Sequence, residues 1–434
     1  MTNCRNLTAI LIFIVLALKG QAQFVNSYTA ENSPLPFNTV RCLEYSNQTL
    51  WIGTDYGLAK LENETNWTIY NSMNSPLWND NIRALKNDGD SLIWIGTIQG
   101  GLFKFDGSEW VNYTPENSGI GDFLVRGIEI DLNGHIWVAT TEGLYMFDRN
   151  SWNSWSSDDG LLSNNISTIC ADSNTKYIGT INGGVLYFDA LNNFTNHTII
   201  SSGIPDNSAL DIEIDLEGRP WFISPAAGLV VDMGNGGPWN SFNALNSDMP
   251  ANSLLCLTHG EQGEIYIGSE SNGLITKIEN VYLQLNTENS NLTDNHILSI
   301  VKGNSQDLWV GTFNGGICKI VTNQTNHLFE QSDFQVTPNI IKRGQRVNFS
   351  QNIKAQYEIY TLQGKIIQSG HLKNQNYLEI SVPVESSCVF LKINQNGFFS
   401  LEKIIINQEP KPLKMLYTFQ KASLQIFQGK AFLS

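Results

Sequence analysis

Three arginines of this chain could bind an acidic group together. They occupy one equivalent position in three successive repeats, Arg41, Arg83 and Arg126, where later repeats have Ser167, Leu210, Leu255 and Leu298. A guanidinium group binds a carboxylate or sulfate with two parallel hydrogen bonds, so this spacing indicates an acidic glycan as one ligand. Ion pairing within the framework is the alternative explanation.

A second group of side chains could bind the uncharged parts of a ligand. Aromatic rings can stack on sugar rings, while Asn, Gln and Glu can form hydrogen bonds with hydroxyl groups. Candidates of both kinds fall in turns or before apolar segments: Tyr56, Trp78, Gln99, Glu142, Asn182, Glu270, His296 and Phe313. The alternative is that they are ordinary exposed loop residues.

Catalytic and metal-binding patterns are poorly represented. The histidines are scattered along the chain and none has the spacing of metal ligands: His135, His197, His259, His296, His327 and His371. Asp131–Gly134 and Asp215–Gly218 resemble calcium loops only faintly, because they lack the later Glu, and hairpin turns explain them. We therefore expect no catalytic residue, no bound metal and no cofactor.

A short sequence motif, which we call the repeated phrase, recurs seven times and marks the elements that position these side chains. It begins at Trp51, Trp94, Trp137, Tyr177, Trp221, Tyr266 and Trp309, and the steps between these aromatics are 43, 43, 40, 44, 45 and 43 residues. A period of 40–45 residues built from strand-like units is typical of a β-propeller with one repeat per blade. The second repeat predicts four short strands, at 81–85, 91–97, 102–105 and 110–113.

The repeat also predicts how blades pack. Side chains alternate across a strand, so Trp94 faces one neighbouring blade and Ile95 the other. Gly96 lets the adjacent blade approach closely. Residues 24–28 resemble the outer strand of a blade, whereas the last repeat lacks one. We therefore predict that residues 24–30 complete the seventh blade and close the ring.

Composition restricts the partners. The net charge of −15 disfavours nucleic acid and anionic lipid. An apolar stretch, Leu7 to Leu18, follows Arg5, and the segment Gly20-Gln21-Ala22 has small residues at the positions that a signal peptidase reads, which predicts a signal peptide over residues 1–22. The apolar run of 12 residues is shorter than the roughly 20 that span a bilayer, and no later segment comes close, so we expect an exported protein without a membrane span.

The pattern Asn-x-Ile-x-x-Ile, then Trp-Ile-Gly-Thr-x-x-Gly-Leu, then Trp-x-x-Tyr resembles the two-component regulator propeller repeat. The resemblance runs from residue 24 to about residue 330. It implies an extracytoplasmic sensor domain, commonly one that responds to oligosaccharides. Members of that family usually carry two such propellers, a membrane helix and a kinase. This chain has one propeller, so the resemblance implies binding rather than direct signal transduction.

Residues 333–407 resemble the C-terminal sorting domain of type IX secretion substrates from Bacteroidetes-type bacteria. The resemblance rests on the segments Pro338-Asn339-Ile340, Tyr357–Ile367, Val389–Ile393 and Lys403–Ile406. It implies contact with the secretion machinery and a final position outside the cell or on its surface. A plain stalk is the alternative, and the protein would then be periplasmic.

The sequence therefore predicts an all-β protein: a seven-bladed β-propeller at 23–330, a small β-sandwich at 331–408, and a tail at 409–434 of unknown role. The predicted function is an exported, non-catalytic, sensor-like propeller that binds an oligosaccharide or a protein ligand. Two alternatives stay open. One is a polysaccharide lyase-type propeller that uses His and Glu in the channel, and the other is a surface protein–protein interaction module.

Overall fold

The structure is a computed structural model. It describes residues 25–89, 92–172, 175–189, 191, 193–233, 239–261, 263–278, 281–304, 307–320, 336–337, 340–342, 346–361, 366–380, 388–395 and 398–407. The signal peptide predicted at 1–22, the tail predicted at 409–434 and His327 lie outside these residues. The chain divides into two units, Met1–His327 and Leu328–Ser434.

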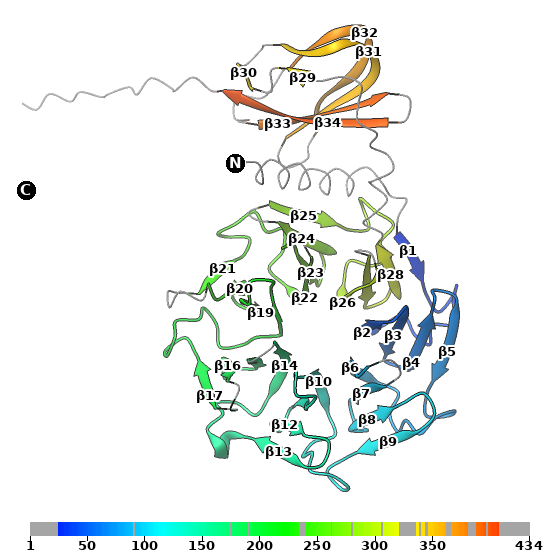
Figure 1. Cartoon of the computed structure of the whole chain (residues 1–434), viewed down its shortest axis with the longest axis vertical. Helices are drawn as coiled ribbons and strands as arrows, with labels where there is room; N and C mark the ends of the chain where they lie inside the picture. Colours follow the sequence, from blue (N-terminus) through cyan, green and yellow to red (C-terminus); the bar gives the residue numbers. More distant parts are fainter. Residues whose placement is uncertain are drawn as a thin grey trace, which may run out of the picture. The chain divides into compact units, whose positions relative to one another are not determined.

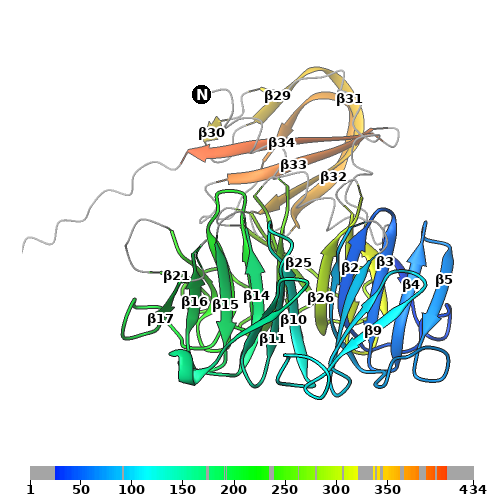
Figure 2. The same cartoon turned by 60° about the horizontal axis from the view of Figure 1, so that its bottom comes forward.

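The described part of the first unit consists of seven four-stranded antiparallel sheets, arranged as blades around an axis (Figure 1). Each blade runs outward from an inner strand, and the inner strands contact one another in a closed cycle, β2–β6–β10–β14–β18–β22–β26 and back to β2. The prediction of a seven-bladed β-propeller is confirmed. Figure 2 shows the strands of several blades side by side.

The blades have these bounds. Blade 1 consists of β2 (Val40–Ser46), β3 (Thr49–Thr54), β4 (Gly57–Glu62) and β5 (Asn66–Tyr70). Blade 2 consists of β6 (Ile82–Asn87), β7 (Ile93–Thr97), β8 (Leu102–Phe105) and β9 (Trp110–Tyr113). Blade 3 consists of β10 (Val125–Ile130), β11 (Ile136–Thr140), β12 (Leu144–Phe147) and β13 (Trp152–Trp155). Blades 4 and 5 are β14 (Ile166–Ala171), β15 (Lys176–Thr180), β16 (Val185–Phe188), β17 (Phe194–His197); β18 (Asp211–Ile214), β19 (Pro220–Ser224), β20 (Gly228–Val231), β21 (Asn240–Phe242). Blades 6 and 7 are β22 (Leu254–His259), β23 (Ile265–Ser269), β24 (Leu274–Ile278), β25 (Val281–Leu285); β26 (Ile297–Lys302), β27 (Leu308–Thr312), β28 (Ile317–Ile320), β1 (Val25–Tyr28). A 3-10 turn, η1 (Ser157–Asp159), lies in the connection between blades 3 and 4.

Blade 7 takes its outer strand from the other end of the propeller. β1 pairs antiparallel with β28, with Val25 opposite Ile320 and Tyr28 opposite Ile317. The Tyr28 ring lies 6.0 Å from that of Trp309 in blade 7. Trp309 in turn belongs to a core cluster with residues of blade 1. The first and last blades are therefore joined both by hydrogen bonds and by apolar packing.

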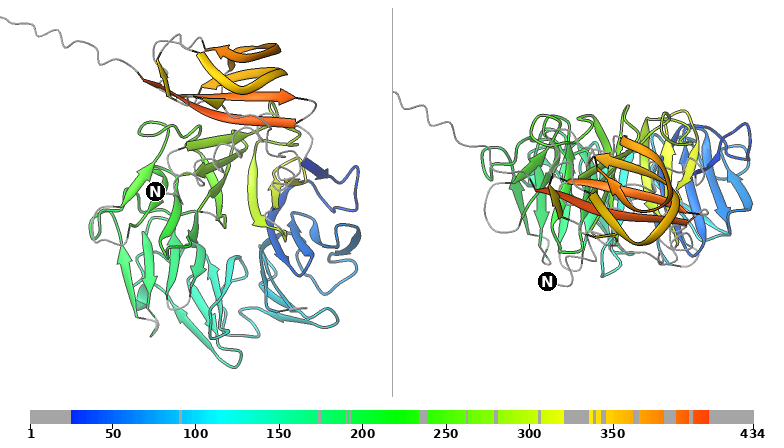
Figure 3. Two further views of the ribbon diagram at one scale, coloured as in Figure 1. Left: turned by 45° about the horizontal axis from the view of Figure 1, so that its top comes forward. Right: turned by 90° about the horizontal axis from the view of Figure 1, so that it is seen from above.

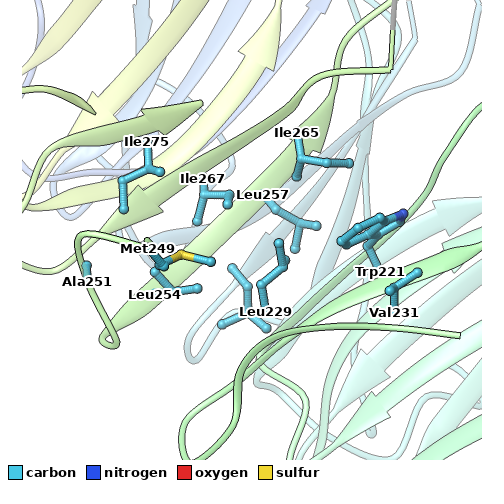
Figure 4. Packing of buried hydrophobic residues seen from close by; sticks show 11 residues of the cluster. Trp221, Leu229, Val231, Met249, Ala251, Leu254, Leu257, Ile265, Ile267 and Ile275 are labelled. Carbon is cyan, nitrogen blue, oxygen red and sulfur yellow. The ribbon is translucent and has the colours of Figure 1, made fainter. Parts of the chain in front are cut away.

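The core lies between blades, as the alternation of the repeated phrase predicts. Trp51 of blade 1 packs in one cluster with Ile95 of blade 2, while Trp94 packs with blade 3. Figure 4 shows the same arrangement between blades 5 and 6, where Trp221 shares a cluster with Ile267. A Cβ added to Gly96 would lie 2.5 Å from Val125 Cγ1 of the next blade, so the predicted close approach is confirmed.

The second unit is a small all-β unit. Its strands β29 (Val336–Thr337), β31, β33, β34 and β30 (Ile340–Lys342) form one sheet in that order, and β32 pairs with β31. The hairpins are β31 (Arg346–Thr361) with β32 (Ile366–Glu379), and β33 (Cys388–Gln395) with β34 (Phe398–Asn407). The long strands β31 and β32 curve strongly (Figure 3), so that Val347, Ile359 and Leu391 share one core.

Candidate functional site

The candidate residues from loops lie at one end of the ring, which we call the loop face. It carries the turns between second and third strands and the connections that lead into the inner strands. Backbone hydrogen bonds join the two sets: the amide of Ile98 donates to the carbonyl of Asn81 at 3.1 Å, and that of Phe313 to His296 at 2.9 Å. Side chains from neighbouring blades therefore converge there.

Arg41 and Asp55 form the best-defined contact of the loop face. Arg41 Nε and Nη2 donate to the two carboxylate oxygens of Asp55, each at 2.9 Å. Asn81 Nδ2 also donates to Asp55 Oδ1, at 3.0 Å. Burial by itself would raise the pKa of Asp55, but the hydrogen bonds from Arg41 and Asn81 and the charges of Arg41 and Arg83 outweigh it and lower the pKa. Asp55 is therefore a stable carboxylate at neutral pH.

The other two predicted arginines have weaker partners. Arg83 Nη2 lies 4.0 Å from Asp55 Oδ1, and Arg126 donates to the amide oxygen of Asn165. Burial lowers the pKa of both guanidinium groups, and for Arg83 the neighbouring charges of Arg41 and Arg126 lower it further. The structure thus brings together three like charges, of which one is fully paired.

Two aromatic pairs flank the Arg41–Asp55 contact. The Phe313 ring stacks on the His296 ring at a centroid distance of 4.9 Å, and the Arg41 guanidinium carbon lies 5.7 Å from the Phe313 centroid. The Tyr56 and Phe37 rings are 4.5 Å apart. These residues come from blades 7 and 1. The contact between Phe313 and Arg41 could not be deduced from sequence spacing.

Several of these rings are accessible. Tyr56 is 61% exposed and Phe313 36% exposed, and Trp78, in the connection from blade 1 to blade 2, is 74% exposed. Each of these exposed rings can offer a flat apolar face to a ligand.

The remaining candidates belong to the turns of other blades. Gln99, Glu142, Asn182 and Glu270 are all exposed. The amide of Glu142 donates to Thr140 Oγ1 within its own turn, and that of Asn182, which has a φ of 67°, donates to Ser208 Oγ. Their described contacts are with neighbouring turns and not with the arginine cluster.

Two members of the cluster escaped the sequence-based selection: Asp55 and Phe37. Asp55 stands in the same turn position as Phe313, and it places a carboxylate in a repeat whose inner strand also carries an arginine. That coincidence was the available signal. Phe37 gave none, because it precedes its strand as one apolar residue among many.

A second group of charged side chains lies deeper along the inner strands. Lys86 Nζ contacts Glu129 Oε1 at 2.7 Å, and His259 Nδ1 lies 3.6 Å from Glu213 Oε2. Burial raises the pKa of Glu129, and it raises the pKa of Asp211 to about 7. Within the described residues, no three acidic, His or Cys side chains come together in a way that could hold a metal ion.

The fold and the loop face define this chain as a seven-bladed β-propeller protein with a small all-β unit after it. Comparisons with solved structures place it beside extracellular propellers. It resembles the extracellular domain of BT3049 from B. thetaiotaomicron, described as a hybrid two-component system, at 18% identity and a TM-score of 0.60, over 89% of this chain and 58% of that one. No family model and no curated protein matches the chain.

Two further similarities are to other kinds of propeller protein. One is PorZ, a surface component of the type IX secretion system of Porphyromonas gingivalis, at 16% identity and a TM-score of 0.55, over 86% of this chain and 60% of that one. The other is virginiamycin B lyase from Staphylococcus aureus, at 13% identity and a TM-score of 0.56, over 68% and 98%. This chain spans less than two thirds of the BT3049 and PorZ structures. At these identities the likeness extends to the fold alone.

Among the described residues, no helix has the length and apolar character that crossing a bilayer requires.

Proposed function

We propose that this protein is an exported, non-catalytic, sensor-like propeller that binds a glycan or another extracellular ligand at the loop face. One observation carries the proposal: Phe313 and His296 stack beside the Arg41–Asp55 pair. Such a group offers flat apolar surface next to fixed hydrogen-bonding groups, which is the combination that sugar rings require. Tyr56, which follows Asp55 in the chain, and Trp78 are two further exposed rings of the loop face.

The similarity to extracellular propellers supports an exported location, together with the signal peptide predicted at residues 1–22. We further propose that residues 331–408 act as a type IX sorting module that contacts the secretion machinery. The likeness to PorZ supports this association. A fusion of residues 331–434 to a passenger protein tests it, since the module should carry the passenger to the surface of a type IX-competent bacterium.

A lyase is the second candidate function. It is favoured by the His259–Glu213 pair on neighbouring inner strands, at 3.6 Å, and by the likeness in fold to lyase propellers. His259 lies at the opposite end of its strand from the loop face, so such a reaction would occur at a different place from the proposed ligand surface. A third candidate, a protein–protein interaction module, predicts neither glycan binding nor turnover.

A glycan array with the chain from residue 23 onward tests the proposal, with parallel detection of released products. Trp78→Ala and Phe313→Ala should each weaken binding of any positive glycan about tenfold, because each removes a stacking surface. Met73→Ala is a matched control: Met73 is 89% exposed and lies in the same connection as Trp78, and its loss should change nothing. Release of unsaturated sugars would support the lyase instead. Absence of both binding and products would leave the interaction module.

A further inference from the structure

The residue next to the start of each inner strand forms a ring around the axis, which we call the bulge ring. In six blades the ladder to the second strand shifts register at this point, for example between Val40 and Cys42. The shift leaves one residue unpaired and turns its side chain out of the alternating pattern. The bulge ring consists of Arg41, Arg83, Arg126, Ser167, Leu210, Leu255 and Leu298, where Leu210 directly precedes β18.

This ring is chemically polarised. Blades 1, 2 and 3 contribute guanidinium groups, while blades 5, 6 and 7 contribute leucines, and all of these residues are half-buried. A framework role would not require the same bulged position to carry charge on one side and aliphatic groups on the other. Bulges commonly re-aim a side chain beside a binding site, and here they direct the cationic side of the ring to the loop face.

The positive charge of this sector is incompletely neutralised. Asp55 is held by both nitrogens of the Arg41 fork, which leaves Arg83 at 4.0 Å from the same carboxylate. Arg126 donates to the neutral amide of Asn165, and the charge of Asp122 also acts on it. Two carboxylates, Asp55 and Asp122, therefore face three guanidinium groups. Partly buried like charges side by side are unfavourable unless an anion joins them. The Arg41–Asp55 contact displays the geometry that a second carboxylate would adopt.

We propose that Arg83 and Arg126 bind a carboxylate of a short acidic oligosaccharide at the loop face. This inference rests on the proposed function and specifies its ligand class. Phe313 borders the same sector through Arg41, so a sugar ring attached to the carboxylate can contact an aromatic face. A short ligand fits better than a long polyanion, because the chain as a whole carries a net charge of −15 and repels extended negative charge.

Isothermal titration calorimetry with uronate trisaccharides and their methyl esters tests the proposal. The ester keeps the sugar rings and removes the negative charge. We expect the chain to bind at least one free acid, trigalacturonate or trimannuronate, and to bind its ester at least about tenfold more weakly. Arg83→Gln and Arg126→Gln should each weaken binding of the acid about tenfold and leave binding of the ester unchanged.

Two further variants complete the design. Lys302→Gln removes one positive charge from an inner strand at the end away from the loop face, and it should leave binding of the acid unchanged. Arg83→Lys keeps the charge and loses the fork, so it should weaken binding and keep the preference for the acid. If the glutamine variants do not fold, Arg83→Lys with Arg126→Lys serves as the test.

The outcomes separate the two proposals. If acid and ester bind equally and the glutamine variants bind like the parent, the carboxylate inference is overturned while glycan binding stands. If the chain binds only neutral glycans, and Trp78→Ala weakens that binding, the carboxylate inference is likewise overturned and glycan binding stands. If neither uronates nor any array glycan binds, both proposals fail. Loss of acid binding in the arginine variants alone, with Lys302→Gln intact, supports the carboxylate site.

Discussion

At the residue scale, the tryptophan of the repeated phrase lies among apolar neighbours but carries an indole N–H that needs a hydrogen-bond acceptor. The indole nitrogens of Trp94, Trp137 and Trp221 each donate to an aspartate in the preceding hairpin, at 3.0, 3.0 and 2.7 Å. The partners are Asp88, Asp131 and Asp215. A buried N–H needs an acceptor, so these blades position both groups together. The aspartates in the faint calcium-loop patterns, Asp131 and Asp215, therefore serve their own hairpins.

Replacing Asp131 by Ala should destabilise the protein by about 2–3 kcal/mol. The change leaves the buried Trp137 indole without its acceptor, and it removes the turn contacts that Asp131 Oδ1 accepts from the amides of Asn133 and His135. Urea denaturation measures the effect. In a Trp137→Phe background the same replacement should cost less, because the indole donor is gone. Equal costs in both backgrounds would contradict the proposed indole contribution.

Asp211 predicts a pH dependence of stability. Burial raises its folded-state pKa to about 7 from an ordinary value of 3.8. The stabilisation due to the proton is complete below about pH 4 and is lost as the pH rises toward and through 7. Between pH 5 and pH 8 the parent should therefore lose about 2 kcal/mol more stability than Asp211→Asn, as thermal unfolding at both pH values would show. Identical pH profiles would contradict this assignment.

At the scale of elements, the glycine in the repeated phrase fixes the distance between blades. Gly96→Ala should lower the free energy of unfolding by about 2–3 kcal/mol, because the new Cβ would lie 2.5 Å from Val125 Cγ1 and 2.9 Å from Val125 Cβ. Chemical denaturation gives the value. Gly127→Ala is the matched control: its Cβ would have no neighbour closer than 3.4 Å, so the loss should be below about 1 kcal/mol.

The connections between blades repeat one hydrogen-bonded turn, which accounts for part of the abundant Asn. The Asn74 side chain accepts from the amide of Asn71 at 2.8 Å and donates to the carbonyl of Ile69 at 3.0 Å. The Asn289 side chain makes the equivalent pair of bonds between blades 6 and 7. Asn is suited to this role because one short side chain supplies both an acceptor and a donor.

At the scale of the whole molecule, ring closure should determine cooperativity. Removing residues 24–30 takes away β1, leaves β28 as an open edge and removes Tyr28 from the ring of Trp309. We expect the melting temperature to fall by about 5 °C or more, with self-association of the exposed edge. Calorimetry and size-exclusion chromatography measure both effects. Removing residues 409–434 is the control and should change neither, and an unchanged melting point after loss of β1 would contradict the closure role.

The number of blades, their strand order and the interblade packing were predictable from the sequence because each depends on residues close together in one repeat or on its recurrence. The seven phrases, each led by Trp or Tyr and five of them with Gly two residues later, carry that information locally. The Trp–Asp hydrogen bonds were not predicted, although both partners lie within six residues, because their pairing depends on the hairpin bringing the carboxylate over the indole.

The candidate site was predictable only in part. The equivalence of Arg41, Arg83 and Arg126 followed from the repeat, since equal positions in adjacent blades must lie side by side. That Arg41 holds Asp55 while Arg83 stays 4.0 Å away did not follow, because rotamers and loop paths decide it. The stacking of Phe313 on His296 likewise joins residues 17 positions apart in two separate loops.

By itself, the sequence determined the scaffold. Its repeats specify the strands, the turns and the contacts between blades, and seven such blades close into a ring. Only the tertiary structure decided which polar groups on the loop face form close ion pairs and which arginines have weaker partners. The physical reason is one of range. Strand and blade formation depend on alternation and turn chemistry within about 40 residues, whereas ion pairing and ring stacking depend on ångström-scale distances between side chains of different blades.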